Sequence, residues 1–462
     1  MAVYGTVRVK DNVKYYEFQY SYGKVFPPQP TYHPGGVFLN FEKYYVEARE
    51  KIKCVTAVDG VPLASQWDPN GYYYAISVAQ YGLSHHAKSI LFGNPAPEVD
   101  VHKRCVFFRN LETSWTVVEE LDCAKLTESH HVAGPTIKLN TALQALCLDV
   151  FMTGPGGVTV KIVNKLGSEG YIHFIQDDAY MIVEGNHVTY GMGTRHLNRW
   201  LHLARDLSVD WMKSLGPVKY NSPNLFFKIV DVTLHGNGYL DNLTVAANAH
   251  IDHLIHSADW LVNNQDPMGG WPTEIGMRTG DIQLKPGWYS AMGQGQAMST
   301  LVRAYNVTGF LESEEGAGGG FWLGSEEGGV RARFLGQLDW YEEYPTTPTS
   351  TFVLNGFIFS MLGLYDVMKT VDGESQQLSE KLWNAGLKSL KIMIGMYDSG
   401  TGTLYDLRHV INHEQPNRAR WDYHTTHIAL VQEMAIIDGD PIFHQTANRW
   451  IDYMYGIKSK HN

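Results

Sequence analysis

The sequence predicts an α+β multidomain protein: an N-terminal β-hairpin layer and a β-sandwich or barrel, followed by a C-terminal (α/α) toroid, or α-barrel. At 462 residues the chain is too long for one ordinary hydrophobic core. Short apolar or alternating runs fill its first half, and apolar residues recur three and four positions apart in its second half. These observations place the predicted domains at residues 1–60, 61–245 and 246–462.

Strand patterns separated by turns extend from Val3 to about Asp241. Residues 158–163 (VTVKIV) and 226–234 (FFKIVDVTL) are rich in β-branched and aromatic side chains. The sequences TGPGG and GSEG supply turns between such runs. Up to about Gly60 the aromatic residues are denser and the turns less regular, which predicts a separate hairpin layer.

Helical periodicity replaces the strand pattern after Asn242. Two helix ends, at residues 261–271 and 394–405, each place an aspartate, then glycines, then an aromatic residue after a helix. A helix pair closed by a repeated glycine-rich loop predicts a toroid whose loops line one concave face. The predicted helical segments are residues 246–262, 288–304, 353–367, 382–396, 426–437 and 441–457.

Composition and charge exclude several classes of function. A net charge of −11 argues against a general nucleic-acid-binding protein. The sequence has no P-loop, no dinucleotide fingerprint after a strand and no GxSxG elbow, so we expect no organic cofactor. No apolar run approaches the roughly 20 residues needed to span a bilayer, and no signal segment opens the sequence. Buried free thiols and a disulfide both remain open for Cys54, Cys105, Cys123 and Cys147.

Tyrosines, carboxylates and arginines concentrate in three short segments, at residues 340–345 (WYEEYP), 404–409 (LYDLRH) and 420–427 (RWDYHTTH). These residue types suit removal of a carbon-bound proton beside a carboxylate and return of another. Because arginine offers a planar fork that matches a carboxylate, Arg408 is the candidate for neutralising a substrate carboxylate. The alternative interpretation of WYEEYP is a loop stopped by Pro345, with both of its glutamates solvated.

The histidines of RWDYHTTH, His424 and His427, lie three residues apart and could share one helical face as metal ligands. No third ligand stands at a spacing typical of zinc sites, and Thr425 or Thr426 before an apolar run is typical of a helix start. We therefore favour capping and local hydrogen bonding over zinc.

These three segments and four others closely resemble the heparan sulfate D-glucuronyl C5-epimerases. The other four are YHPGGVFLNFE at residues 32–42, VPLASQWDPNGYYY at 61–74, NGYLDNLTV at 237–245 and PGWYSAMGQGQA at 286–297. The resemblance extends from the first fifty residues to the C-terminus and is weakest around residues 89–134 and 312–335.

The resemblance implies a fold, an activity and a cellular setting. Members of the family invert carbon 5 of D-glucuronic acid within N-sulfated heparosan, giving L-iduronic acid in heparan sulfate and heparin biosynthesis. It implies a homodimer of the Golgi lumen with a β-hairpin domain, a β-barrel and a C-terminal α-barrel. Family members carry an N-terminal membrane anchor, and no such segment is expected in this chain. The expected partner is the N-sulfated heparosan or heparan sulfate polysaccharide.

Residue chemistry and the resemblance indicate the same catalytic groups. Inversion needs one side chain on each face of the sugar, and Glu343 and Tyr423 are the predicted pair. Tyr344 and Tyr405 are predicted to assist by hydrogen bonding or proton relay. A tyrosine with a pKa of about 10 is a poor base but a competent acid at neutral pH, so a nearby cation, Arg408 or Arg420, would poise it. Which side chain serves which face stays open.

The resemblance also implies residues that hold the polysaccharide and a structural ion. The substrate-binding residues that it implies are Tyr44, Arg49, Glu50, Lys51, Gln66 and Tyr74 in the β half and Asn355 in the helical half. Without the resemblance, we would assign the basic side chains of YYVEAREKIKC to the polar face of a strand. It implies a structural Ca²⁺ with Asp241 as one ligand, since calcium favours oxygen ligands.

Three other interpretations of the same residues remain. A polysaccharide lyase would begin with the same proton removal and then expel the C4 oxygen. A glycoside hydrolase would use two carboxylates among Glu343, Asp406 and Asp422, but would not need so many tyrosines. A heparan-binding module without catalysis would use the aromatic and basic residues only to hold the chain.

Overall fold

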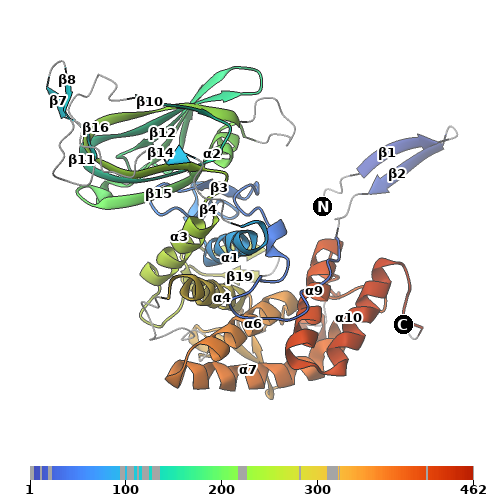
Figure 1. Cartoon of the computed structure of the whole chain (residues 1–462). Coiled ribbons are helices and arrows are strands. Elements are labelled where there is room, and N and C mark those ends of the chain that lie inside the picture. Colours follow the sequence, from blue (N-terminus) through green and yellow to red (C-terminus); the bar gives the residue numbers. More distant parts are fainter. Residues whose placement is uncertain are drawn as a thin grey trace. The chain divides into compact units, whose positions relative to one another are not determined.

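The computed structural model describes residues 5–10, 13–18, 23–93, 99–100, 109–111, 114–116, 124–126, 136–216, 226–279, 282–309, 321, 323–412 and 415–460. The chain forms two compact units (Figure 1). The β unit is Glu42–Asn263, and the helical unit combines Met1–Phe41 with Asn264–Asn462. This division differs from the three predicted ranges at both boundaries, because the first 41 residues group with the distant C-terminal helices.

Among the described residues, the β unit contains a nine-stranded sheet, a three-stranded sheet, a two-stranded sheet and three α-helices. Its elements are β3 (Ile52–Val55), β4 (Pro62–Ala64), β5 (Tyr72–Tyr73), α1 (Ala75–Phe92), β6 (Val99–Asp100), β7 (Arg109–Leu111), β8 (Ser114–Thr116), β9 (Ala124–Leu126), β10 (Thr136–Thr141), β11 (Ala145–Asn164), β12 (Glu169–Ile175), β13 (Ile182–Glu184), β14 (His187–Gly191), β15 (Trp200–Asp206), α2 (Leu207–Ser214), β16 (Phe226–Ala246) and α3 (His250–Asn263).

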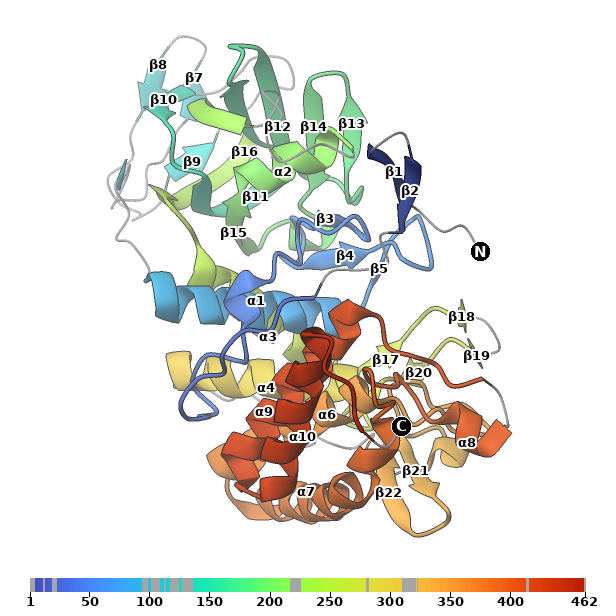
Figure 2. The ribbon, with the colours of Figure 1, turned by 90° about the vertical axis from the view of Figure 1, so that its right-hand side faces the viewer.

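Two long antiparallel strands, β11 and β16, organise the large sheet. The strand order is β10-β16-β11-β12-β14-β13, and Figure 2 shows β12, β14 and β13 side by side. β11 pairs with β15 along its first part and with β12 along its second, with a register shift against β16 between Met152 and Gly156. Alternate residues of β11, including Val158 and Val160, are fully buried. The predicted strands at residues 158–163 and 226–234 are thereby confirmed.

A helix stands where the sequence analysis expected strands. α1 replaces the strand pattern directly after β5 and packs against α3, so most of its surface is buried. Its second half carries His85 and His86, both buried. The strand pattern that the sequence analysis extended over this segment was wrong here, because a helix buried on most sides lacks the one-sided apolar stripe by which a helix is recognised.

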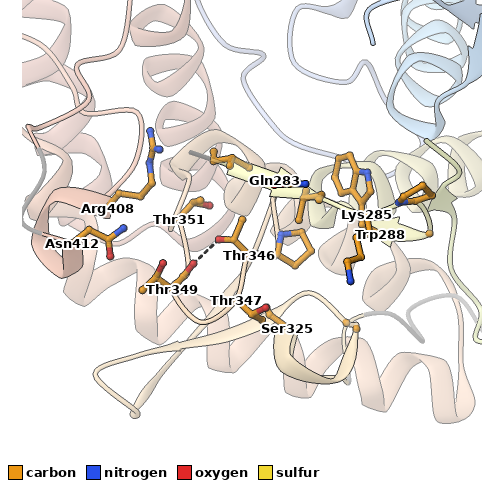
Figure 3. A pocket seen from close by; sticks show the side chains of 17 residues that line it. Gln283, Lys285, Trp288, Ser325, Thr346, Thr347, Thr349, Thr351, Arg408 and Asn412 are labelled. Carbon is orange, nitrogen blue, oxygen red and sulfur yellow. Dashed lines mark hydrogen bonds between the residues drawn. The ribbon is translucent and has the colours of Figure 1, made fainter. Parts of the chain in front are cut away.

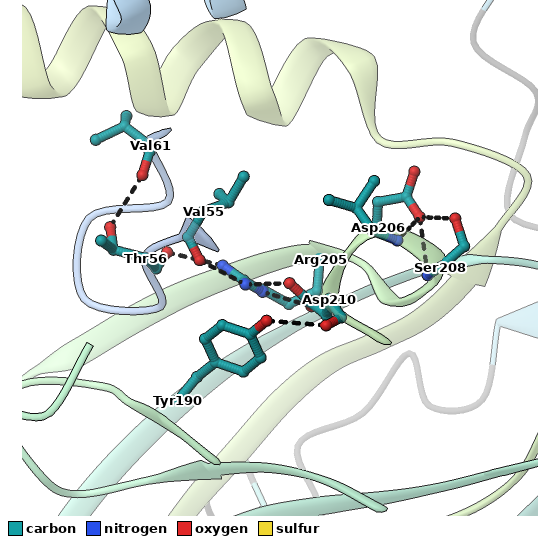
Figure 4. Close-up of polar contacts among 9 residues, drawn as sticks. Val55, Thr56, Val61, Tyr190, Arg205, Asp206, Ser208 and Asp210 are labelled. Atoms are coloured by element: carbon teal, nitrogen blue, oxygen red, sulfur yellow. Dashed lines mark hydrogen bonds and ion pairs between the residues drawn. The ribbon is translucent and has the colours of Figure 1, made fainter. Parts of the chain in front are cut away.

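A buried ion pair fastens the small β3-β4-β5 sheet to the rest of the β unit (Figure 4). Arg205 Nε and Nη2 donate to the two carboxylate oxygens of Asp210, at 3.1 and 2.5 Å, while Nη1 and Nη2 donate to the carbonyl oxygens of Thr56 and Val55. The hydroxyl of Tyr190 donates to the backbone oxygen of Asp210. Each nitrogen of the guanidinium group thus donates to an acceptor, as a buried charge requires.

Two cysteines of the β unit are free thiols, Cys54 and Cys147. Burial raises the pKa of the Cys54 thiol to about 12, so it is an unreactive core side chain. Cys105 and Cys123 lie outside the described residues, as does any disulfide between them.

The helical unit combines a helix bundle with short hairpins. Its elements are β1 (Gly5–Lys10), β2 (Val13–Phe18), β17 (Pro272–Thr273), β18 (Met277–Thr279), β19 (Ile282–Leu284), β20 (Trp288–Tyr289), α4 (Ala291–Thr308), β21 (Arg331–Phe334), β22 (Leu338–Tyr341), α6 (Leu354–Thr370), α7 (Gly373–Met393), α8 (Arg408–Asn412), α9 (Trp421–Asp438) and α10 (Pro441–Met454). α4 packs on α6, α6 on α7 and α9, and α9 on α10.

The crossing of α4 and α6 depends on two glycines. A Cβ atom on Gly363 would lie 2.2 Å from the backbone oxygen of Gly295, so the backbones touch where these residues meet. The six predicted helical segments all overlap observed helices. α9 begins at Trp421, earlier than the start predicted at Thr425 or Thr426.

The segment from residue 23 to 41 packs on α4 and α6. Arg303 of α4 and Asp366 of α6 form a fully buried ion pair at 2.7 Å. The segment covers it, since the Tyr32 hydroxyl donates to Asp366 at 2.7 Å and the carbonyl oxygen of Gly36 accepts from Arg303 Nε at 3.0 Å. These contacts explain why the N-terminal segment belongs to the helical unit.

Within the ranges that the structure describes, every helix is too short or too polar to cross a membrane.

Candidate active site

Glu343 is a buried carboxylate, the second residue after the end of β22. Only 4% of the residue is exposed, and Asn355 Nδ2 donates to its Oε2 at 3.1 Å. Burial raises its pKa to about 7, while hydrogen bonds from Tyr344 and Asn355 oppose that rise. A Cβ atom on Gly356 would lie 2.5 Å from Glu343 Oε2, so a glycine is needed beside the carboxylate. A carboxylate with this pKa can accept a proton near neutral pH.

The preceding residue, Glu342, is fully buried, and its carboxylate stabilises the loop. Its carboxylate accepts hydrogen bonds from the backbone nitrogen of Thr351 (3.0 Å), the Thr351 hydroxyl (2.6 Å) and the backbone nitrogen of Phe352 (3.0 Å). Phe352 has a φ of 55°, so this turn is strained and needs such support. The interpretation of WYEEYP as a loop with solvated glutamates is wrong for both residues.

The same turn fixes the segment that carries Tyr405. Leu354 N donates to the carbonyl oxygen of Tyr405, and Leu407 N donates to that of Thr351, both at 3.1 Å. Tyr405 N in turn donates to the carbonyl oxygen of Asn417 at 2.7 Å. The Glu342 carboxylate and these backbone contacts together join two of the three predicted segments, 340–345 and 404–409.

Tyrosines link Glu343 to the third segment. Tyr344 makes side-chain hydrogen bonds with both Glu343 and Tyr405. The rings of Tyr405 and Tyr423 meet edge to face with centroids 4.9 Å apart. Burial and the nearby Glu343 carboxylate raise the pKa of Tyr405 well above its usual value, so it keeps its proton at neutral pH. The Arg420 guanidinium lies 5.4 Å from the centroid of the Tyr423 ring. The structure thus assembles all four predicted catalytic residues.

Arg408 is oriented by Asp406. Its Nε and Nη2 lie 3.1 and 3.0 Å from Asp406 Oδ2, and Asn417 Nδ2 donates to the same oxygen at 2.7 Å. Asp406 is almost fully buried, whereas 20% of the Arg408 side chain is exposed. The carboxylate fixes the direction of the guanidinium group and balances part of its charge, which the sequence analysis did not foresee.

A polar pocket of about 700 Å³ adjoins this cluster (Figure 3). Trp288, whose ring packs 6.0 Å from that of Tyr344, and Lys285 stand on one side, and Arg408 and Asn412 on the other. Hydroxyl-bearing residues lie between the two sides. They are Ser325, Thr346, Thr347, Thr349 and Thr351. This volume lies within the range typical of ligand-binding pockets.

His424 and His427 are structural. Both are fully buried, and their Nδ1 atoms lie 3.0 and 2.9 Å from the hydroxyl of Thr403. His424 Nε2 lies 3.0 Å from the carbonyl oxygen of Trp450. The predicted local hydrogen bonding is confirmed.

The other predicted substrate-binding residues belong to the β unit. The Arg49 guanidinium lies 5.3 Å from the Tyr44 ring centroid and donates to Gln80 at 2.8 Å. Tyr74 is buried and packs edge to face with Trp67. Glu50, Lys51 and Gln66 are exposed.

Asp241, the predicted calcium ligand, lies on β16. Its Oδ1 accepts from Asn242 N at 2.7 Å. Its cross-strand neighbour Asp149 is already bonded to His202 (2.6 Å) and to Asn242 Nδ2 (2.6 Å). Among the described residues no group of three or more His, Cys, Asp or Glu side chains could hold a metal ion. The described surroundings of Asp241 do not fit a calcium site, and the ion stays a prediction.

Sequence reasoning missed the pocket wall and the role of Asp406. The hydroxyl-rich stretch TTPTS after WYEEYP was the available signal for the wall. Asp406 was weighed only as a hydrolase carboxylate, and its two-residue spacing to Arg408 was the signal for an ion pair.

Comparison with known proteins agrees with this geometry. The family model described as "D-glucuronyl C5-epimerase C-terminus" matches residues 265–452, and "D-glucuronyl C5-epimerase, beta-sandwich domain" matches residues 124–237. The D-glucuronyl C5-epimerase of Caenorhabditis elegans is 34% identical over 515 aligned positions, which cover 97% of this chain and 83% of that protein. An uncharacterized protein of Methanocaldococcus jannaschii is 30% identical over 176 positions, 36% of this chain and 53% of that protein. A β-sandwich domain followed by a helical C-terminal region is thus confirmed.

Proposed function

Because this chain belongs to the D-glucuronyl C5-epimerase family and is an epimerase acting on glucuronyl residues, we propose that Glu343 and Tyr423 exchange protons with carbon 5 from opposite faces. The observation that carries this proposal is the connected cluster from Asn355 through Glu343, Tyr344 and Tyr405 to Tyr423. Within this cluster, the Glu343 carboxylate can take a proton near pH 7, and Tyr405 keeps its own proton at that pH.

Proton removal from carbon 5 places a second negative charge on the uronate. The electron pair of the C5–H bond delocalises into the carboxylate as an enediolate, and the proton passes to the Glu343 carboxylate. We assign Arg408, held by Asp406, to the carboxylate oxygens, where fixed hydrogen-bond donors stabilise the developing charge. Because Asp406 offsets part of the charge, Arg408 acts chiefly as an oriented donor.

Reprotonation completes the inversion. The Tyr423 hydroxyl gives its proton to carbon 5 on the opposite face and becomes a phenolate. Glu343 then gives its proton to Tyr344, Tyr344 passes one to Tyr405, and Tyr405 passes one to the adjoining Tyr423 phenolate, which restores the starting state. Atoms and charge balance without an external oxidant, reductant or cofactor.

The wider setting is also proposed, on the strength of the sequence resemblance. The natural substrate is N-sulfated heparosan, converted in the Golgi lumen during heparan sulfate and heparin biosynthesis. The enzyme is a homodimer whose helical unit is an (α/α) toroid. The β-unit residues that hold the polysaccharide are Tyr44, Arg49, Glu50, Lys51, Gln66 and Tyr74.

Incubation with N-sulfated heparosan in heavy water tests the function. We expect NMR to show deuterium at carbon 5 and new iduronate signals, with the polymer length unchanged. An ultraviolet-absorbing unsaturated uronate with chain shortening would establish the lyase instead, and new reducing ends would establish a hydrolase. Binding without any carbon-5 exchange would leave only a heparan-binding module.

The pH profile of kcat/KM tests the role of Glu343. Only the carboxylate form can take the proton, and its pKa is about 7. We therefore expect kcat/KM to fall as pH drops below about 7, while the raised pKa of Tyr405 keeps that group protonated throughout. Asn355→Leu removes a hydrogen bond that lowers the pKa of Glu343, so the midpoint should move to higher pH. A midpoint near the ordinary glutamate value of about 4.3, or one unmoved by Asn355→Leu, would contradict the assignment.

A further inference from the structure

A threonine hydroxyl joins two histidines beside the catalytic tyrosines. Thr403 Oγ1 lies 3.0 Å from His424 Nδ1 and 2.9 Å from His427 Nδ1, and all three residues are buried. Thr403 stands two residues before Tyr405, and His424 directly follows Tyr423. The hydroxyl therefore connects the two segments that carry the tyrosines whose rings meet.

The partners of this network assign its hydrogens. Burial lowers the pKa of both imidazoles, that of His427 to about 3, so each ring is neutral at neutral pH and carries one N–H. His424 Nε2 lies 3.0 Å from the carbonyl oxygen of Trp450. Because a carbonyl oxygen only accepts, this nitrogen holds the hydrogen of His424, and its Nδ1 accepts from the Thr403 hydroxyl. The hydroxyl oxygen in turn accepts from His427 Nδ1.

The remaining imidazole nitrogen agrees with this direction. His427 Nε2 is buried, and within the described part of the chain it has no hydrogen-bond partner. With its hydrogen on Nδ1, the ring has no N–H at Nε2 that needs an acceptor. The hydrogen bonds thus follow one direction, from His427 through Thr403 and His424 to Trp450, and leave no donor of these side chains unpaired.

Backbone hydrogen bonds hold the segment of Thr403 and Tyr405 to residues that precede α9. Ala419 N donates to the carbonyl oxygen of Thr403 at 2.9 Å, and Tyr405 N donates to that of Asn417 at 2.7 Å. The N-cap residue Arg420 makes no side-chain hydrogen bond to the first turn of the helix. These backbone bonds locate the start of α9 but do not contact its first turns.

The Thr403 hydroxyl reaches the helix itself. His424 and His427 are three residues apart, so they share one face of α9, and two bonds to one oxygen fix how that face is turned. Tyr423 belongs to the same turn as His424. The network therefore also sets the Tyr423 ring against that of Tyr405, with their centroids 4.9 Å apart.

We propose that Thr403 is a positioning residue for inversion, and that its hydroxyl, through His424 and His427, holds Tyr423 where it meets both Tyr405 and the sugar. The proposal rests on the proposed function, because it concerns the group that delivers the second proton. Thr403 acts through Tyr423 and itself takes part in no proton transfer to carbon 5.

Thr403→Val keeps the shape of the side chain and removes the hydroxyl. The test measures the initial rates at which N-sulfated heparosan gains carbon-5 deuterium in heavy water. Deuterium in glucuronate reports return from the Glu343 side, and deuterium in iduronate reports delivery by Tyr423. We expect the iduronate rate to fall about ten- to hundredfold, the glucuronate rate to fall much less, and KM to stay unchanged. Thr403→Ser, which retains the hydroxyl, should restore most of the iduronate rate.

Thr300→Val is the matched control. Thr300 is equally buried, and its hydroxyl donates within α4 to the carbonyl oxygen of Gln296 at 2.8 Å. Both of its deuterium rates should equal those of the wild type. A Thr403→Val enzyme whose two rates are unchanged or fall in equal proportion would overturn the positioning role. A Thr403→Ser enzyme as slow as Thr403→Val would overturn it as well.

NMR of the isotope-labelled wild-type protein gives a readout that needs neither activity nor a folded variant. We expect the imidazole hydrogen of His424 on Nε2 and that of His427 on Nδ1. The same tautomer on both rings, or a charged ring at neutral pH, would overturn the network. A wild type with the expected tautomers that is inactive on every glucuronyl polymer would instead overturn the proposed function, and with it the role of Thr403 in turnover.

Discussion

Replacing Glu343 with glutamine is expected to lower kcat by about 10²- to 10⁴-fold, the usual contribution of a positioned general base. Glutamine has nearly the same shape, can still accept the hydrogen bond of Asn355 and needs no more room beside Gly356. It cannot take the carbon-5 proton. Turnover should be followed by deuterium incorporation at carbon 5, and binding by calorimetry with an oligosaccharide.

Binding is the second half of this prediction. The Kd of Glu343→Gln should stay within about threefold of the wild type, because the lost interaction develops only along the reaction path. Glu374→Gln makes the same chemical change at an exposed position of α7 and should leave both quantities unchanged. A parallel loss of binding and turnover would mean that Glu343 holds the sugar and does not act as the base.

Replacing Arg303 with methionine is expected to cost about 3–5 kcal/mol of stability, because it leaves Asp366 buried without its partner. For a unit of this size that corresponds to a fall in melting temperature of about 10 °C. The loss should be confined to the calorimetric transition of the helical unit, since the pair lies within it.

Two further variants separate this effect from general damage. Arg303→Met with Asp366→Leu removes both charges and should recover part of the loss. Arg333→Met breaks a pair of the same kind, with Asp339 at 3.1 Å, but 57% of the Arg333 side chain is exposed. It should cost at most about 1 kcal/mol. Equal losses from the buried and exposed pairs would contradict the argument from desolvation.

The elements of the fold were largely predictable, because their signals are local. Each segment shows its pattern in its own residues. This holds for the apolar periodicity of α4, α6, α9 and α10 and for the alternation in β11. α1 was missed because burial on most sides removes the polar face that marks a helix. The grouping of residues 23–41 with the C-terminal helices could not be predicted from the sequence. It depends on contacts between residues far apart in the chain, such as that of Tyr32 with Asp366.

The candidate site likewise contains residues that the sequence predicts and residues that it does not. Three motifs identified Glu343, Tyr405 and Tyr423, and the fold brings them together as expected. The adjacent Glu342 and Glu343 are indistinguishable in sequence, and only the turn at Thr351 and Phe352 shows which one is structural. Lys285 shares no motif with the catalytic residues, so only the three-dimensional pocket connects it to them.

The two-part origin of the helical unit has a consequence for biosynthesis. Tyr32 and Gly36 leave the ribosome before Arg303 and Asp366 are translated, with all of Glu42–Asn263 made in between. At roughly 5–20 residues per second, the nascent N-terminal segment waits on the order of ten seconds or more for the helices that it will cover. The β unit can therefore fold co-translationally, while the earliest-made segment docks among the last.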